Sequence, residues 1–162
     1  MSRGRSTGPY FRVTATIDGA DAPIGHIMGF AVAIAGYVHL DEMRVSNAAL
    51  RAEASGTRGL PGAFGAGLLM GTFALCKLRD MGCRSAELLA INDNAYQYRR
   101  LVRYYERMGF RSIREVGAGE SPFLVELCDQ LTWGGAGMLM AAEVDDVLRK
   151  WSRAFDAKEG DA

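Results

Sequence analysis

At 162 residues, with 49% hydrophobic and 23% charged residues, the chain has the size and composition of one globular domain with a substantial core. Its 19 basic and 19 acidic residues cancel, which excludes a strongly charged protein adapted to nucleic acid or to an anionic membrane. Three cysteines, Cys76, Cys83 and Cys128, lack metal-binding spacing and indicate free thiols in a reducing compartment.

The two ends of the chain are predicted to be disordered. Residues 1–9 are basic and rich in serine and glycine but lack the apolar stretch of a secretory signal, and we expect disorder again over residues 156–162. The most apolar run, residues 27–38, is too short to span a membrane. We therefore expect a single domain over residues 10–155. Its location should be intracellular and cytoplasmic, or a plastid if the source is photosynthetic and the N-terminus is incomplete.

The first third of the chain is predicted to form an antiparallel meander. Residues 10–17 alternate in polarity and are rich in β-branched side chains, and residues 18–23 (DGADAP) are turn formers. Two further strands are predicted over residues 24–34 and 37–45.

A glycine-rich loop follows the meander. Residues 46–67 are rich in alanine, glycine and serine, and a loop of this length inside a domain is usually functional. Its end, Gly62-Ala-Phe-Gly65-Ala-Gly67, leads into a helix predicted over residues 68–81. Glycines there would let the backbone approach a phosphate, and the helix N-terminus would attract its charge. The alternative is a flexible linker, and no Lys-Ser/Thr follows the last glycine as in a P-loop.

The second half of the chain alternates strands and helices. Residues 86–91 are apolar on both faces and predict a buried central strand. A hairpin is predicted from residues 110–116 and 123–127, and an amphipathic helix over residues 143–155. The apolar face of this last helix consists of Val144, Val147, Leu148 and Trp151. With a helix over residues 94–110, the order β-β-β-α-β-α-β-β-α predicts an α/β domain around a mixed sheet.

The segment NAYQYRRLVRYYERMGF, residues 94–110, predicts an amphipathic helix that ends at Gly109. Its apolar face carries Tyr98, Leu101, Val102, Tyr105 and Met108. Its arginines, Arg99, Arg100, Arg103 and Arg107, fall mostly on the other face and favour a solvated surface over a nucleic-acid patch. Tyr105 is either a core residue or a proton donor, and the helical pattern leaves both open.

The succession of strand, Gly-x-Gly, helix, strand, Asn, helix and Tyr-x-x-x-Gly-Phe resembles the GNAT superfamily of acyl-CoA-dependent N-acetyltransferases over residues 10–128. Gly65-Ala66-Gly67 is similar to the end of that family's Arg/Gln-x-x-Gly-x-Gly/Ala loop. Residues 93–110 and the LTWGG segment from Leu131 look most like uncharacterised GNAT-like proteins of plants, algae and cyanobacteria. The resemblance implies a GNAT-like central mixed β-sheet flanked by helices, without the family's usual N-terminal strand and helices.

The resemblance further implies a site for acetyl-CoA as cosubstrate, with no metal. The residues that it assigns to coenzyme A are Met43, Arg44, Val45, Gly62, Gly65, Ala66, Gly67, Leu68, Asn94 and Tyr98. The pyrophosphate would lie on the amides of residues 65–68, and the pantetheine arm would pair with the backbone of residues 43–45. Gly62 stands where the family has Arg or Gln. Tyr105 would protonate the departing thiolate, because a phenol with an unperturbed pKa near 10 stays protonated at neutral pH.

The general base is open between His39 and Asp41. Side chains alternate along a strand, so these two share one face and Glu42 points the other way. The intrinsic pKa of a histidine suits a base, although a histidine on a strand is commonly structural.

We therefore predict an N-acetyltransferase that moves an acetyl group directly from the thioester to an amine acceptor, with positioning supplying much of the rate. The alternative is a catalytically inactive GNAT-like module that binds coenzyme A or a protein partner. The acceptor, a protein or a small molecule, is not readable from the sequence. We expect no nucleic-acid or membrane partner, and a homodimer in which a second subunit covers the substrate side stays open.

Overall fold

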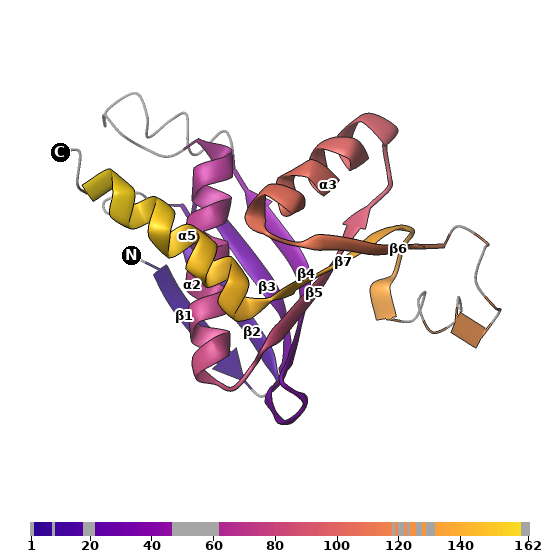
Figure 1. Ribbon diagram of the computed structural model, residues 1–162, viewed down its shortest axis with the longest axis horizontal. Helices are drawn as coiled ribbons and strands as arrows, with labels where there is room; N and C mark the ends of the chain where they lie inside the picture. The colour runs from indigo at the N-terminus through magenta and orange to yellow at the C-terminus, as the bar shows by residue number, and fades with distance from the viewer. Residues whose placement is uncertain are drawn as a thin grey trace. The chain divides into compact units, whose positions relative to one another are not determined.

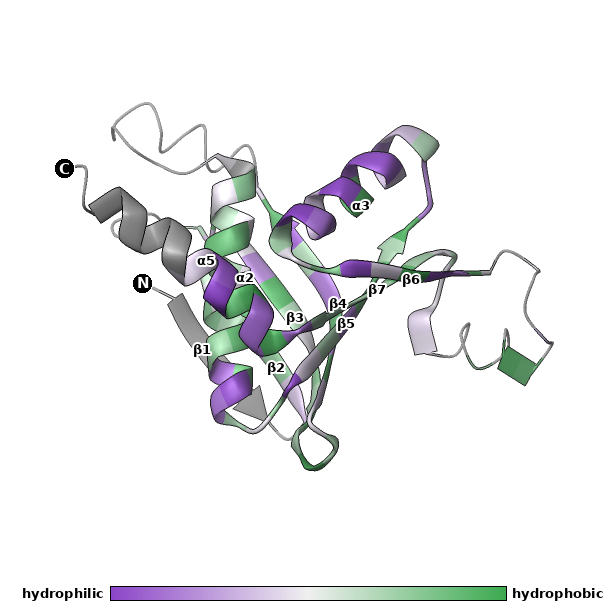
Figure 2. Ribbon diagram, viewed as in Figure 1, coloured by the Kyte–Doolittle hydropathy of each residue, from purple (hydrophilic) through white to green (hydrophobic). Residues whose placement is uncertain are grey.

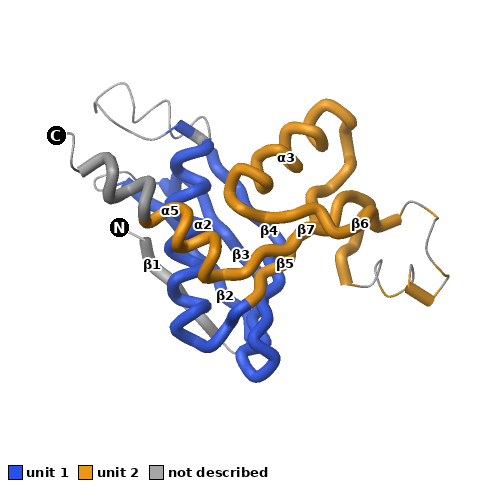
Figure 3. The backbone as a smooth tube through the Cα atoms, viewed as in Figure 1, with its two compact units in different colours: residues 1–84 blue, residues 85–162 orange. Residues whose placement is uncertain are grey.

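The computed structural model (Figure 1) describes residues 2–7, 9–17, 22–46, 62–117, 119, 122, 124–125, 128 and 132–159. The chain divides into two compact units, Met1–Arg84 and Ser85–Ala162 (Figure 3). Each unit consists of antiparallel strands with at least one long helix packed on them, so the predicted α/β class is confirmed. None of the described helices combines the length and the apolar character needed to cross a lipid bilayer.

The first unit is a four-stranded antiparallel sheet with one long helix. Its strands lie side by side in chain order: β1 (Ser2–Thr7), β2 (Tyr10–Ala15), β3 (Gly25–Val32) and β4 (Tyr37–Val45), with a short 3-10 helix, η1 (Ala33–Ala35), before β4. Helix α2 (Ala63–Asp80) contacts β2, β3 and β4. Burial alternates along β3, and Met70 of α2 lies against Gly25. Helix α2 therefore covers the sheet face to which the odd-numbered residues of β3 point.

Two boundaries in this unit differ from the sequence prediction. Residues 2–7 pair with β2 along their whole length as β1, whereas we expect disorder over residues 1–9 from the sequence. Helix α2 begins at residue 63 and not at 68. Ala66 and Leu68 are both buried there, and this burial outweighs the low helix propensity of the neighbouring glycines. Most of the predicted loop, residues 47–61, lies outside the described residues.

The second unit is a three-stranded antiparallel sheet with two helices. Its strands are β5 (Ser85–Ile91), β6 (Arg111–Val116) and β7 (Gly137–Glu143), and β7 lies between the other two. Helix α3 (Ala95–Met108) contacts all three strands, and α5 (Val144–Glu159) contacts β7. Figure 2 shows a largely hydrophilic α3, in agreement with the arginines of its outer face.

Strand β7 is absent from the sequence prediction, which pairs β6 with residues 123–127 instead. Leu124 and Val125 are helical and exposed, and the rest of that segment lies outside the described residues. The sequence of β7, GMLMAAE, contains no β-branched residue and is rich in good helix formers. It forms a strand because β5 and β6 supply hydrogen-bonding partners along both of its edges.

Helix α5 carries the predicted apolar face. Val144, Val147 and Leu148 are buried, and the indole N–H of Trp151 donates to the carbonyl oxygen of Met108 at 2.9 Å. The helix runs to residue 159 and not to 155, so most of the predicted disordered tail is helical. Packing of α5 on β7 and on the end of α3 holds the second unit together.

Candidate active site

The start of α2 is a candidate anion site. Gly62 is its N-cap and supplies no side-chain cap, and no acidic residue lies in the first turn. First-turn amides lack intrahelical acceptors and attract negative charge. The amide of Ala66 already donates to the carbonyl oxygen of Gly62 at 2.9 Å, and the amides after it continue the helical pattern. The amides of residues 63–65 therefore precede the first intrahelical hydrogen bond, and phosphate binding by the amides of residues 65–68 stays a prediction.

The three residues expected to pair with pantetheine form the last positions of β4: Met43, Arg44 and Val45. Their partners on β3 are, in the same order, Ile27, His26 and Gly25. One edge of β4 is thus taken by β3 over this stretch. Pairing of its other edge with pantetheine stays a prediction.

A β-bulge in β4 decides how the candidate bases are arranged. The pairing of β3 with β4 shifts between Met28, which lies opposite Glu42, and Gly29, which lies opposite the residue two positions earlier. Asp41 is therefore the extra residue of the bulge. Gly29 makes this close approach possible, because a Cβ atom at that position would lie 2.1 Å from the carbonyl oxygen of His39.

The bulge reverses the predicted direction of Glu42. Glu42 lies opposite Met28, and its Oε2 is 3.4 Å from Nε2 of His26. His26 and Met28 share a face of β3 with Phe30, the residue opposite His39. Since residues opposite one another point to the same side of a sheet, Glu42 and His39 share a face. The prediction that Glu42 points the other way is wrong, because regular alternation fails at a bulge.

His39 and Asp41 are in direct contact, in agreement with the prediction that they share a face. Nε2 of His39 lies 2.7 Å from Oδ1 of Asp41. The two side chains differ in exposure, 2% for His39 and 45% for Asp41. The imidazole stacks on the ring of Phe30 at a centroid distance of 4.6 Å and an interplanar angle of 14°. The buried histidine therefore contacts Phe30 through its ring and Asp41 through Nε2, while the carboxylate of Asp41 remains accessible.

In the second unit, Tyr105 lies on the buried face of α3 and is 8% exposed. Its ring meets Tyr104 and Phe110 edge-on, at centroid distances of 5.3 and 6.0 Å. Burial raises the pKa of Tyr105, with a smaller contribution from Tyr104, and burial raises the pKa of Tyr104 to about 12. Tyr105 is thus protonated throughout the neutral range. A raised pKa weakens a proton donor, and burial of this kind is typical of a core residue, so the role of general acid stays a prediction.

Asn94 and Tyr98, both assigned to coenzyme A by resemblance, have partners within the second unit. Asn94 is the N-cap of α3, and its Oδ1 accepts from the amides of Tyr96 at 2.9 Å and Gln97 at 3.3 Å. The Tyr98 hydroxyl donates to Oε1 of Glu115 at 3.1 Å, and desolvation, followed by that carboxylate, raises the pKa of Tyr98. Their roles in cofactor binding stay predictions.

Gly29 and Phe30 are missing from the sequence prediction, although both shape the surroundings of His39. A single glycine inside a strand pattern is a known sign of a bulge or of a close backbone approach, so Gly29 carries a readable signal. Phe30 carries none, because its partner His39 is set by the register of two strands.

Three solved structures show what the chain is similar to. A GNAT-family protein from Desulfovibrio desulfuricans has a TM-score of 0.55 and 20% identity, covering 84% of this chain and 69% of its own. The ribosomal-protein-S18-alanine N-acetyltransferase of Escherichia coli has a TM-score of 0.55 and 14% identity, covering 86% and 72%. An aminoglycoside 6'-N-acetyltransferase complexed with coenzyme A has a TM-score of 0.53 and 11% identity, covering 84% and 73%.

The chain has the GNAT fold. The similar structures span both units, and the sequence resemblance to that superfamily is confirmed at the level of the fold. No protein-family model matches the sequence, and a search of curated proteins finds no match either. At identities of 20% and below, the GNAT fold is what the likeness establishes.

Proposed function

We propose that this protein is an acetyl-CoA-dependent N-acetyltransferase that transfers the acetyl group directly to an amine. The GNAT fold is the observation that supports this most strongly, because the E. coli and aminoglycoside proteins are N-acetyltransferases by name and one of them has coenzyme A bound. A thioester is already activated, so the protein has to bind, orient and move protons.

The first unit supplies the proposed cofactor contacts. The first turn of α2, after Gly62, offers backbone amides and the positive end of the helix dipole to the pyrophosphate. The end of β4, residues 43–45, offers a strand edge to the pantetheine arm. Both elements belong to one compact unit, and α2 contacts β4 directly.

In the proposed reaction, the neutral amine attacks the carbonyl carbon of the acetyl thioester. The carbon–sulfur bond then breaks, and the thiolate takes a proton from the hydroxyl of Tyr105. The proton lost by the amine goes to the base, for which His39 and Asp41 are the candidates. The phenol of Tyr105 is protonated at neutral pH and so has a proton to give, while the burial that raises its pKa makes it a weaker donor to the thiolate. The His39–Asp41 contact gives the base a defined position.

Calorimetry with acetyl-CoA and a Tyr105→Phe variant test this proposal. We expect micromolar binding of acetyl-CoA by both proteins and a fall in kcat on the order of 100-fold in the variant, the usual scale of general acid catalysis. Tyr104→Phe is the matched control, since it removes the neighbouring phenol and should leave kcat within about twofold. Absence of acetyl-CoA binding by the intact protein would refute the proposal.

A non-catalytic module that binds coenzyme A is the second candidate. The observation in its favour is Gly62, which replaces the Arg or Gln of the resembling loop and leaves α2 without a side-chain cap. This reading predicts that acetyl-CoA binds while no amine in a broad panel is acetylated. Turnover that depends on Tyr105 excludes it.

A further inference from the structure

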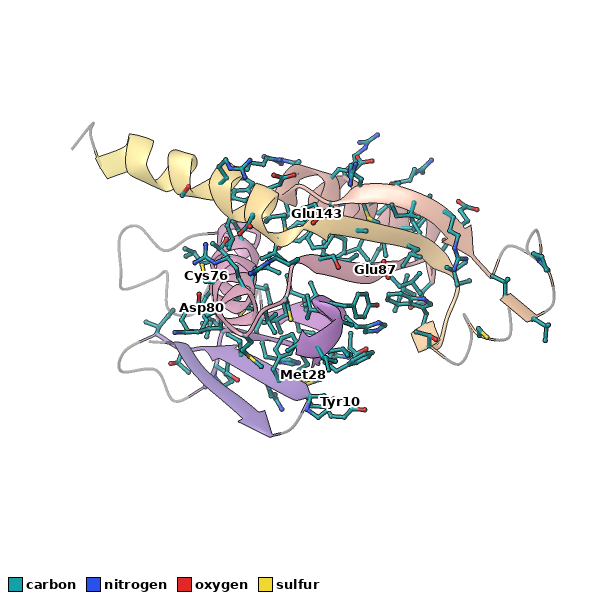
Figure 4. All side chains as sticks on the ribbon, turned by 60° about the horizontal axis from the view of Figure 1, so that its bottom comes forward. Tyr10, Met28, Cys76, Asp80, Glu87 and Glu143 are labelled. Atoms are coloured by element: carbon teal, nitrogen blue, oxygen red, sulfur yellow. The ribbon has the colours of Figure 1, made fainter. Side chains whose placement is uncertain are left out.

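A row of rings crosses the sheet face of the first unit opposite α2. Tyr10 of β2 meets Phe30 of β3 edge-on at a centroid distance of 6.1 Å, and Phe30 stacks on His39 of β4 at 4.6 Å. Tyr10 is 64% exposed, and Phe30 is part-exposed. Figure 4 shows Tyr10 and Met28 on this sheet. The face thus carries a row of aromatic rings that leads from Tyr10 of β2 to the β4 bulge.

The strip ends at the carboxylate of Asp41. His39, buried beneath it, donates from Nε2 to Oδ1 of Asp41 at 2.7 Å and so fixes the direction of the carboxylate. Among the residues that the structure describes, Asp41 pairs with His39 and with no arginine or lysine.

The neighbouring carboxylate is differently engaged. Glu42 contacts the guanidinium of Arg44 and also Nε2 of His26. The positive charge of Arg44 therefore balances the negative charge of Glu42. Arg12 is a further cation of this face, exposed on β2 opposite Met28. The two acidic residues of the bulge therefore differ: Glu42 belongs to a charge cluster with Arg44 and His26, and Asp41 offers an accessible carboxylate near aromatic rings.

We propose that Asp41, Phe30 and Tyr10 form the acceptor subsite, which takes a primary ammonium group carried on an apolar or aromatic body. This inference rests on the proposed acetyltransferase function. A carboxylate held by a buried donor gives the ammonium a charged hydrogen bond, and the neighbouring rings offer an aromatic surface on which an apolar body can pack. His39 is a positioning residue, since it acts through Asp41.

The adjacent pair Asp41 and Glu42 allows a matched experiment. We expect Asp41→Asn to raise KM for 2-phenylethylamine about 10- to 100-fold, the usual effect of losing a hydrogen bond to a charged group. Glu42→Gln should leave KM within about twofold, and both variants should bind acetyl-CoA normally in calorimetry. Phe30→Leu should raise KM about 2- to 5-fold, the scale of one lost aromatic packing contact.

The positioning role of His39 has its own readout. His39→Gln keeps an N–H near the position of Nε2 and should restore most of the affinity for 2-phenylethylamine that His39→Leu removes. A purely structural histidine would show the same loss in both variants.

Direct binding separates a failure of this inference from a failure of the proposed function. Titration of 2-phenylethylamine, followed by its NMR line width, measures the subsite whether or not acetyl-CoA binds, and we expect the broadening to disappear in Asp41→Asn. Broadening that survives in Asp41→Asn overturns the subsite. A higher kcat/KM for spermidine than for 2-phenylethylamine would overturn the proposal that the acceptor carries an apolar or aromatic body.

Discussion

The replacement Gly29→Ala tests the link between the β4 bulge and the candidate site. A Cβ atom at residue 29 would lie 2.1 Å from the carbonyl oxygen of His39, whereas real Cβ contacts essentially never fall below 3.0 Å. The backbone of β4 must therefore retreat by the difference, about 0.9 Å, at His39 itself. Backbone has no alternative rotamer, so we expect a cost of about 1–3 kcal/mol, typical of overpacking.

The expected readouts follow from these two magnitudes. A cost of about 1–3 kcal/mol lowers Tm by about 2–12 °C for a chain of this size. A displacement of nearly 1 Å at the His39–Asp41 pair should reduce kcat/KM for the amine on the order of 100-fold, because catalytic geometry tolerates little misplacement. Thermal unfolding by circular dichroism and steady-state kinetics at a temperature where the variant is folded measure the two effects.

Gly137→Ala provides the control. A Cβ atom at residue 137 would also lie 2.1 Å from a carbonyl oxygen, that of Ala90, but in the second unit. We expect a similar fall in Tm with the KM of the amine unchanged within about twofold. If Gly29→Ala keeps the wild-type Tm and amine kinetics, or if both variants lose the amine equally, the bulge does not set the site.

Three further predictions concern the second unit. Removing the α3 cap in Asn94→Ala should destabilise the protein by about 1 kcal/mol, seen as a lower denaturant midpoint with an unchanged slope. Trp151→Phe keeps the apolar packing but loses the bond to Met108, and its unfolding free energy should fall by about 1 kcal/mol or more. Raised pKa values of Tyr104 and Tyr105 in the folded state mean that their stabilisation is complete below pH 10 and is lost as the pH rises to about 12 and beyond. Absorbance at 295 nm should therefore show late-titrating phenols, one fewer in Tyr105→Phe, and early titration of all of them would contradict the burial.

Local chemistry in the sequence determined several elements. The bounds of β4, residues 37–45, agree with the sequence prediction, and Gly36, with φ of 66°, turns the chain into the strand. Helix α3 lies where NAYQYRRLVRYYERMGF predicts it, because Asn94 caps its start and Gly109, with φ of 116°, ends it. The apolar face of α5 follows from helical periodicity alone. In each case the deciding contacts lie within a few residues along the chain.

Tertiary structure decided the elements whose partners are distant. Strand β7 has a helix-like composition, and only pairing with β5 and β6 makes it a strand. The N-terminal strand β1 depends in the same way on its pairing with β2. A segment of this kind carries little pattern of its own, since its hydrogen-bond partners are brought to it by the rest of the fold.

The same distinction applies to the candidate site: the local pattern predicts part of it, and the register between strands decides the rest. The sequence by itself placed His39 and Asp41 on one face of a strand, because side chains alternate with a period of two. The bulge at Asp41 brought Glu42 to that face as well, and its pairing with His26 left Asp41 as the accessible carboxylate. A bulge arises from the register between two strands, and register is a property of the folded sheet.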